Sequence, residues 1–227
     1  MGVAAVIFDW GGTLTPWHAI DPRGPWREVV ADEEVAHRLA LAEDEVWRRS
    51  RDHHRSGTLD DVFAAVGLEL TPDMRAAIST WWDPHTFTDP DVRPLFEALR
   101  ARDLRIGVLS NTIWSREEHE RIFARDGLLD LIDGAVYTSE IEWTKPHPLA
   151  FRAALDAVGV ARAEEAVFVG DRPFDDIHGA RSAGLRTVLI SHSDIPEGQK
   201  GPVAGEPDAV IDRLADLLAI VDEWRGA

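Results

Sequence analysis

The sequence predicts an α/β fold, in which helices flank a parallel β-sheet and a helical domain is inserted after the first strand. Short apolar runs recur along the chain, and each is followed by small or polar residues and then by a segment with helical spacing. That alternation is typical of a parallel sheet. Residues 16–87 break it, because they contain no strand-like run and have the pattern of several helices. A chain of 227 residues is long enough for one such domain with a lid.

The local pattern identifies the individual elements. The segment from Val92 to Leu99 carries apolar side chains at helical spacing, with Asp89 and Pro90 placed as N-cap and first helical residue. Ser115 followed by Glu118 fits a capping box and predicts a second helix. Six short apolar runs are the predicted strands, at residues 4–8, 106–109, 135–137, 166–169, 187–190 and 209–211.

These elements divide the chain into two predicted domains. Residues 1–15 and 88–227 form the core domain, which contains the sheet, and residues 16–87 form the helical cap domain. Within the core domain, residues 193–207 are rich in Gly and Pro and are predicted to be a surface loop. The cap holds tryptophans that most simply give it a small core of its own, namely Trp17, Trp26, Trp47, Trp81 and Trp82.

Composition excludes several classes of function. The chain carries 24 Lys and Arg against 41 Asp and Glu, a net charge of −17, so it would repel a nucleic-acid backbone or an anionic membrane. It has no cysteine, which excludes disulfides, thiolate nucleophiles and cysteine-ligated metals. No apolar run approaches the ~20 residues of a membrane span, and no basic leader precedes Asp9. We expect a soluble, cytoplasmic protein, whose oligomeric state the sequence does not indicate.

Four polar clusters each follow a predicted strand. In an open parallel sheet the carboxyl ends of the strands lie at one edge, so we expect these clusters to meet there and to bind a ligand. Lys145 belongs to the third cluster and is one of only two lysines in the chain. The clusters are residues 9–14, 110–111, 144–148 and 170–176.

The residue types in these clusters suit a phosphate and a metal ion. Gly11 and Gly12 allow backbone N–H groups to approach an anion closely. If Asp9, Asp171 and Asp176 meet, their like charges need compensation, which one divalent cation and the Lys145 ammonium would supply. Ligation by oxygen alone, beside a phosphate, points to Mg²⁺.

At these four clusters the sequence resembles the haloacid dehalogenase superfamily, whose members are mostly Mg²⁺-dependent phosphohydrolases with a Rossmann-like core. The resemblance implies that Asp9 is the nucleophile and becomes an aspartyl phosphate. It implies that the Gly11 carbonyl and Asp171 hold Mg²⁺ together with Asp9, supported by Asp176 and by Asp175. The phosphoryl group would be bound by Gly11, Gly12, Ser110, Asn111 and Lys145.

The position of the insertion also matches this family. About 70 residues separate the first cluster from the next predicted core helix, and the family places its first kind of cap, usually helical, in that gap. Such a cap would exclude water and select the substrate. The resemblance therefore implies a small phosphorylated substrate, most simply a phosphate ester.

The sequence departs from the family motif at Gly11. The common motif carries a second aspartate there, which protonates the leaving group and then activates water, and such catalysis contributes about 10²–10⁴-fold. Three explanations are compatible with a glycine at this position. Another residue supplies the proton, the leaving group needs little protonation, or turnover is poor or absent. Two alternatives therefore stay open beside the phosphatase. One is a metal-independent 2-haloacid dehalogenase, and the other is a degenerate member that binds a phosphorylated ligand or a protein partner without catalysis.

Candidate replacements for the missing acid come mainly from the cap. His53 and His54 lie between two predicted helices, in a loop that faces the active site in related caps, and His18 closely follows the first cluster. Each of these is otherwise an ordinary solvated side chain. Arg172 contacts an anionic substrate or forms a surface ion pair. Three tryptophans lie within a few residues of the clusters and either form the wall of a substrate cavity or pack in the core, namely Trp10, Trp114 and Trp143.

Overall fold

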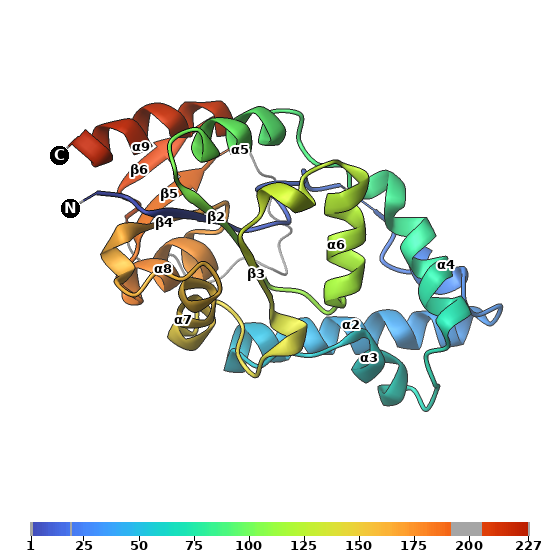
Figure 1. The fold of residues 1–227 in the computed structure, drawn as a ribbon. Helices are drawn as coiled ribbons and strands as arrows, with labels where there is room; N and C mark the ends of the chain where they lie inside the picture. The colour runs from blue at the N-terminus through green and yellow to red at the C-terminus, as the bar shows by residue number, and fades with distance from the viewer. Residues whose placement is uncertain (1, 19, 192–205, 227) are drawn as a thin grey trace.

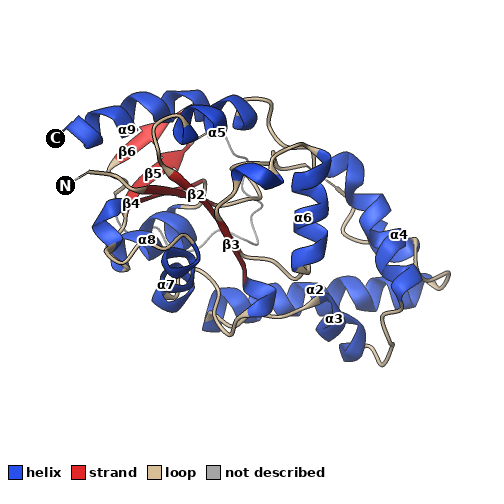
Figure 2. Cartoon of the chain, in the orientation of Figure 1, coloured by secondary structure: helices blue, strands red, loops and turns tan. Residues whose placement is uncertain are grey.

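A six-stranded parallel sheet forms the centre of the molecule (Figures 1 and 2). It is seen in a computed structural model that describes residues 2–18, 20–191 and 206–226. The strand order is β3-β2-β1-β4-β5-β6. The strands are β1 (Ala5–Phe8), β2 (Arg105–Ser110), β3 (Gly134–Tyr137), β4 (Ala166–Gly170), β5 (Arg186–Ile190) and β6 (Ala209–Ile211).

The strand order places a crevice beside β1. The chain runs outward from β1 through β2 to β3, and then crosses back to β4 on the other side of β1. A ligand site in an open α/β sheet lies where the strand order reverses in this way, beyond the carboxyl ends of the strands. Asp9 directly follows β1 and Asp171 directly follows β4, so the topology brings both to that crevice.

Helices cover both faces of the sheet. On β1, Val6 and Phe8 pack on one face with α5 and α9, whereas Ala5 and Ile7 pack on the other with α7 and α8 (Figure 1). The α-helices are α1 (Gly24–Arg27), α2 (Glu33–His53), α3 (Leu59–Ala65), α4 (Pro72–Trp82), α5 (Val92–Arg100), α6 (Arg116–Arg125), α7 (Pro148–Ala157), α8 (Gly179–Ser182) and α9 (Leu217–Gly226). The shorter helical turns are η1 (Asp83–His85), η2 (Leu129–Leu131), η3 (Thr138–Glu140), η4 (Ala163–Glu165), η5 (Pro173–His178, a π-helix) and η7 (Leu214–Asp216).

Helices α1 to α4 pack around a separate apolar cluster. Trp26, Leu39 and Phe63 are buried in it, and Ile113 from the segment after β2 joins them. The helices α2, α3 and α4 each begin with a side-chain cap. Asp32, Thr58 and Thr71, respectively, accept a backbone N–H of the first turn. Figure 1 shows α2, α3 and α4 together beyond the ends of the strands. The division into a core domain and a cap domain stays a prediction.

The six predicted strands are confirmed, each boundary falling within one residue of its prediction. The predicted start of α5 is wrong. Asp89 Oδ1 accepts the N–H of Asp91 in a turn, and the helix begins only at Val92. Ser115 does cap α6 by accepting the N–H of Glu118, but Glu118 binds Arg121 and Ser79 instead of completing the box.

Two sequence predictions concern the surface and the surroundings of the chain. Most of the loop predicted at residues 193–207 lies outside the described residues. Among the helices that the structure describes, none has the length and apolar character needed to cross a bilayer.

Candidate active site

Three carboxylates meet at the crevice beside β1. One oxygen from each of Asp9, Asp171 and Asp176 lies within 4.8 Å of the others, and all three residues are buried. The backbone N–H of Asp9 continues the sheet ladder by donating to Val169 O at 2.9 Å, which fixes Asp9 beside the end of β4. Asp176 lies in the π-helix η5, and its Oδ2 accepts the backbone N–H of Arg172 at 2.9 Å.

Lys145 supplies a buried positive charge to this cluster. Its Nζ lies 2.6 Å from Asp9 Oδ1 and 2.7 Å from Asp176 Oδ1. The backbone of Lys145 is held by Asn111, whose Nδ2 donates to Lys145 O at 3.0 Å and whose Oδ1 accepts Lys145 N–H at 2.9 Å. Ser110, at the end of β2, is buried and lines a cavity together with Asp9 and Lys145. The structure therefore brings together residues from all four polar clusters.

The charges of this cluster are not balanced by Lys145 alone. Burial raises the pKa of Asp176 to about 7, against the opposing effect of Lys145, and it raises the pKa of Asp171 to about 6. Burial also lowers the pKa of Lys145, but the charges of Asp176 and Asp9 outweigh it and the net direction is upward. Asp171 Oδ1 is buried with no hydrogen-bond partner. An orphaned carboxylate oxygen beside two others fits a small, hard dication.

The two glycines of the first cluster differ in how tightly they are enclosed. Gly12 has φ +84°, and a Cβ there would lie 2.3 Å from Asp171 Oδ2 and 2.1 Å from Trp17 Nε1. Only glycine fits that position. A Cβ on Gly11 would instead meet Trp17 Cη2 at 3.6 Å, an ordinary contact distance. The position of Gly11 thus has room for a side chain.

Arg172 and Asp175 form a pair at the edge of the cluster. Arg172 Nη1 lies 3.3 Å from Asp175 Oδ2, and the guanidinium carbon lies 5.1 Å from the centre of the Trp17 ring. Burial raises the pKa of Asp175, and Arg172 opposes that shift. Asp175 is absent from the three-carboxylate group among the described residues, whereas Asp176 belongs to it.

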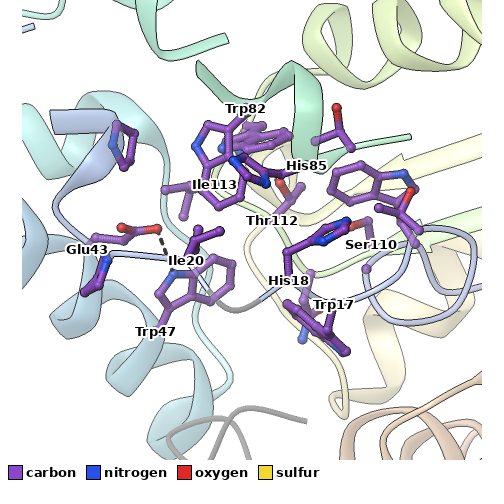
Figure 3. A pocket seen from close by; sticks show the side chains of 18 of the residues that line it. Trp17, His18, Ile20, Glu43, Trp47, Trp82, His85, Ser110, Thr112 and Ile113 are labelled. Carbon is purple, nitrogen blue, oxygen red and sulfur yellow. Dashed lines mark hydrogen bonds between the residues drawn. The ribbon is translucent and has the colours of Figure 1, made fainter. Parts of the chain in front are cut away.

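A cavity of about 480 Å³ opens above the carboxylates, between the sheet edge and the helices α2 and α4 (Figure 3). Asp9, Gly11, Ser110 and Lys145 line it on the sheet side. Several of the side chains in its walls are aromatic. The tryptophans that line it are Trp10, Trp17, Trp47, Trp82 and Trp114.

Two of the three tryptophans predicted near the clusters line this cavity. Trp10 and Trp114 lie 5.5 Å apart between ring centres, and each also packs against an apolar cluster, so wall and core packing coincide. Trp143 does not line the cavity. Its ring stacks on His147 at 3.9 Å, and Arg55 lies over it.

The candidate histidines separate into two groups. His18 lines the cavity and lies 5.6 Å from His85, measured between ring centres. His53 and His54 do not line it. His54 ends α2 in the left-handed region, with φ 54°, and its carbonyl accepts the N–H of Thr144 at 3.0 Å. The structure therefore brings His18, but neither His53 nor His54, to the cavity.

Sequence reasoning missed several residues of this cavity as candidate site residues, among them Trp17, Glu43, Trp47 and His85. Four cavity residues lie on one stripe of α2, at the i, i+3, i+4 and i+7 positions 40, 43, 44 and 47. That spacing is visible in the sequence. The stripe is nevertheless easy to overlook, because it contains two acids and a search for apolar faces does not select it.

Comparison with known proteins identifies the family. Residues 3–184 match the family described as haloacid dehalogenase-like hydrolase, which is most of the chain. The chain belongs to the haloacid dehalogenase-like hydrolases. The resemblance drawn from the four polar clusters is thus confirmed, as is the α/β fold.

Members of this family resemble the chain over nearly its whole length. It is 29% identical to the glyceraldehyde 3-phosphate phosphatase of Methanopyrus kandleri, over 97% of this chain and 98% of that protein. Its fold is similar to that of a haloacid dehalogenase-like phosphatase from Thermococcus onnurineus, with a TM-score of 0.70, 24% identity and coverage of 98% and 100%. It is also similar to the L-2-haloacid dehalogenase RSc1362, with a TM-score of 0.69, 22% identity and coverage of 98% and 100%.

Proposed function

We propose that this hydrolase is a Mg²⁺-dependent phosphatase that cleaves a small phosphate ester through an aspartyl phosphate on Asp9. The observation that carries the proposal is the buried Lys145 ammonium, which bridges Asp9 and Asp176 beside the orphaned oxygen of Asp171. The similarity to a glyceraldehyde 3-phosphate phosphatase supports the same class of substrate.

The residues that would hold Mg²⁺ are Asp9, Asp171, Asp176 and the carbonyl of Gly11. When bound, the ion would neutralise charge on the oxygens of the phosphoryl group. Asp175 is engaged by Arg172, so we assign it a supporting role in orienting η5 and not a direct ligand role. Trp17 donates to Asp171 Oδ2 at 2.9 Å, which fixes that carboxylate and leaves its buried Oδ1 without a hydrogen-bond partner.

The chain's own residues carry the reaction. Lys145 holds Asp9 Oδ1, and the second oxygen of Asp9 attacks phosphorus as the bond to the ester oxygen breaks. The Ser110 hydroxyl, Lys145 and the N–H groups after Asp9 and Ser110 bind the phosphoryl oxygens. Water then attacks the same phosphorus and gives a proton to the residue that protonated the leaving group, which frees Asp9 and releases inorganic phosphate. Asn111 is a positioning residue, because its side chain holds the backbone of Lys145.

The proton for the departing alkoxide needs a donor, since Gly11 has none to give. We assign this role to His18, which lines the cavity together with Gly11 and lies beside His85. An imidazole is able to donate a proton near neutral pH. His53 and His54 are set aside, because neither lines the cavity.

We assign residues 16–87 the role of a cap. Their helices supply the cavity wall opposite the sheet, including Glu43, Trp47 and Trp82. Arg172 lies against the Trp17 ring at the edge of the cavity, where it would add positive charge beside a bound phosphate.

A substrate screen tests the proposal. Purified protein is offered phosphomonoesters and 2-haloacids, each with Mg²⁺ and with EDTA, and phosphate and halide are measured. We expect phosphate release that needs Mg²⁺ and that is lost in Asp9→Asn, whose neutral side chain cannot attack phosphorus. Halide release in EDTA would instead establish the dehalogenase. Binding of a phosphate analogue without any turnover would establish the non-catalytic alternative.

A further inference from the structure

One face of α2 combines an acid with aromatic surface inside the cavity. Ala40, Glu43, Asp44 and Trp47 form the stripe of this helix that lines it. Figure 3 shows Glu43 and Trp47 on one side of the cavity, and Ser110 and His18 on the other. The acid therefore lies at the end of the cavity that is remote from the catalytic residues.

Within the described part of the chain, Glu43 has little to stabilise its charge. Its Oε1 accepts a hydrogen bond from Trp47 Nε1 at 3.3 Å, which is long for this type of bond. Burial raises its pKa to about 7, and the charged residue that adds to the shift is another acid, Asp44. The lysine and arginine that line the cavity are engaged elsewhere, since Lys145 binds Asp9 and Asp176, and Arg172 binds Asp175.

The cavity that Glu43 lines suits a cation. Trp47, Trp82 and Trp114 line the same cavity, and the face of an indole attracts a positive charge. A partly buried carboxylate beside apolar walls pairs with an ammonium group more strongly than one in bulk water does. A hydroxyl group would pair with the same acid, but it would gain nothing from the indole faces.

We propose that the substrate is a phosphate monoester of an alcohol or phenol with a flat apolar body, which carries an amine at the end away from phosphorus, and that Glu43 binds this ammonium. The proposal rests on the phosphatase function for its phosphate end only. The apolar walls bind the body of the substrate, and the catalytic carboxylates and Lys145 receive the phosphate. Glu43 is thus the residue that determines specificity.

Three isosteric substrates test this inference, namely 4-(2-aminoethyl)phenyl phosphate, 4-(2-hydroxyethyl)phenyl phosphate and 4-propylphenyl phosphate. We expect kcat/KM for the amine to exceed that for the other two by at least about tenfold, the scale of a hydrogen bond to a charged group. Glu43→Gln should remove this preference, so that kcat/KM for the amine falls to about that for the other two compounds. Equal kcat/KM for the three compounds in the unaltered protein would overturn the proposal, whether or not the variant folds.

Glu45→Gln is the matched control. Glu45 lies on the same helix but is exposed and pairs with Arg48, so its loss should not change the order of the three substrates. Loss of the amine preference in this control as well as in Glu43→Gln would overturn the assignment to Glu43.

A binding measurement separates this inference from the phosphatase function. 2-Phenylethylamine and 2-phenylethanol, neither of which contains phosphate, are titrated into the protein while tryptophan fluorescence is recorded. Tighter binding of the amine, lost in Glu43→Gln, supports the amine site even if no ester is hydrolysed. Equal or weaker binding of the amine contradicts it even if the protein proves to be an active phosphatase.

Discussion

The indole nitrogen of Trp17 donates a 2.9 Å hydrogen bond to Asp171 Oδ2 across 154 positions of sequence. Trp17 lies at the start of the helical insertion, and Asp171 follows the strand β4 of the sheet. The same indole lies against Gly11 and Gly12. One tryptophan thus orients a candidate metal ligand and encloses the motif glycines, which joins the insertion to the chemistry of the sheet edge.

Trp17→Phe removes this hydrogen bond and keeps most of the ring. Because partners that orient metal ligands typically contribute about 10–100-fold to metal affinity, we expect the Mg²⁺ concentration for half-maximal phosphate release to rise by about tenfold or more. Titration of activity with Mg²⁺ measures it. Trp143→Phe is the control, since Trp143 lies outside the cavity, and an equal rise in both variants would contradict the role of Trp17.

Gly11→Asp should accelerate hydrolysis of esters with poor leaving groups. The new Cβ fits at 3.6 Å from Trp17, and a carboxyl group there would add a proton donor beside the one that we assign to His18. We expect kcat for an alkyl phosphate to rise by about tenfold or more, within the range of positioned acid catalysis. Steady-state kinetics measure the change.

Gly12→Ala is the contrast to this variant. Its Cβ would overlap Asp171 and Trp17, so activity should fall on every substrate. An unchanged alkyl phosphate rate in a folded Gly11→Asp protein would argue against proton donation as the limiting feature.

His18→Asn tests the donor directly. The variant should lose about 10²-fold in kcat on an alkyl phosphate, and far less on 4-nitrophenyl phosphate, whose leaving group needs no proton. Comparison of the two substrates gives the answer, with His53→Asn as control because His53 lies outside the cavity. Equal losses on both substrates would show that His18 acts in binding or structure.

Lys145→Met leaves Asp9 and Asp176 buried without their cation. Breaking a buried pair in this way costs about 3–5 kcal/mol of unfolding free energy, so we expect a loss of that order at pH 7.5 in EDTA. The double variant Asp9→Asn, Lys145→Met should be more stable than Lys145→Met alone, because one uncompensated carboxylate is gone. Denaturant unfolding measures both, and equal stabilities would contradict the pairing.

His119 predicts how stability changes with pH. It is buried, stacks on Tyr137 and is hydrogen-bonded with Thr112, and burial lowers its pKa from 6.5 to about 3. As pH falls below 6.5, His119 binds a proton in the unfolded chain but not in the folded chain, so the free energy of unfolding decreases on the acid side. The contribution between pH 7 and pH 5 is about 2 kcal/mol.

His119→Gln should remove this contribution. The variant is less stable at pH 7, because it loses the stacked ring, but its stability should fall less than that of the unaltered protein from pH 7 to pH 5. Urea unfolding at both pH values measures the difference, with the exposed His37→Gln as control. Parallel losses in the His119 variant and the unaltered protein would refute the assignment.

Most of the residues at the sheet edge are predictable from sequence, because the topology of a parallel sheet determines their position. Asp9, Lys145 and Asp171 follow apolar runs that could only be strands of one sheet, and parallel strands end at one edge. The choice between Asp175 and Asp176 is not predictable in that way. It depends on η5 being wound as a π-helix, which turns Asp176 toward Lys145 and leaves Asp175 to Arg172.

The cavity wall is less predictable, because it depends on how the insertion packs. The sequence predicts that the loop after α2 faces the active site, yet His54 is held by backbone pairing with Thr144 and does not line the cavity. Trp10 and Trp114 show the opposite case, in which residues suited to core packing also form a wall. Contacts between segments far apart in sequence decide both outcomes.

The helix α2 links the remote acid of the cavity to the segment that precedes Lys145. It carries Glu43 near its middle, and at its end Ser50 donates a 3.0 Å hydrogen bond to Thr144, the residue before Lys145. Helical geometry therefore fixes the spacing between the remote acid and the catalytic loop, at 1.5 Å for each residue of rise. This fixed spacing would select substrates by length. A substrate that is too short or too long would not place its phosphate at Asp9 while its other end contacts Glu43.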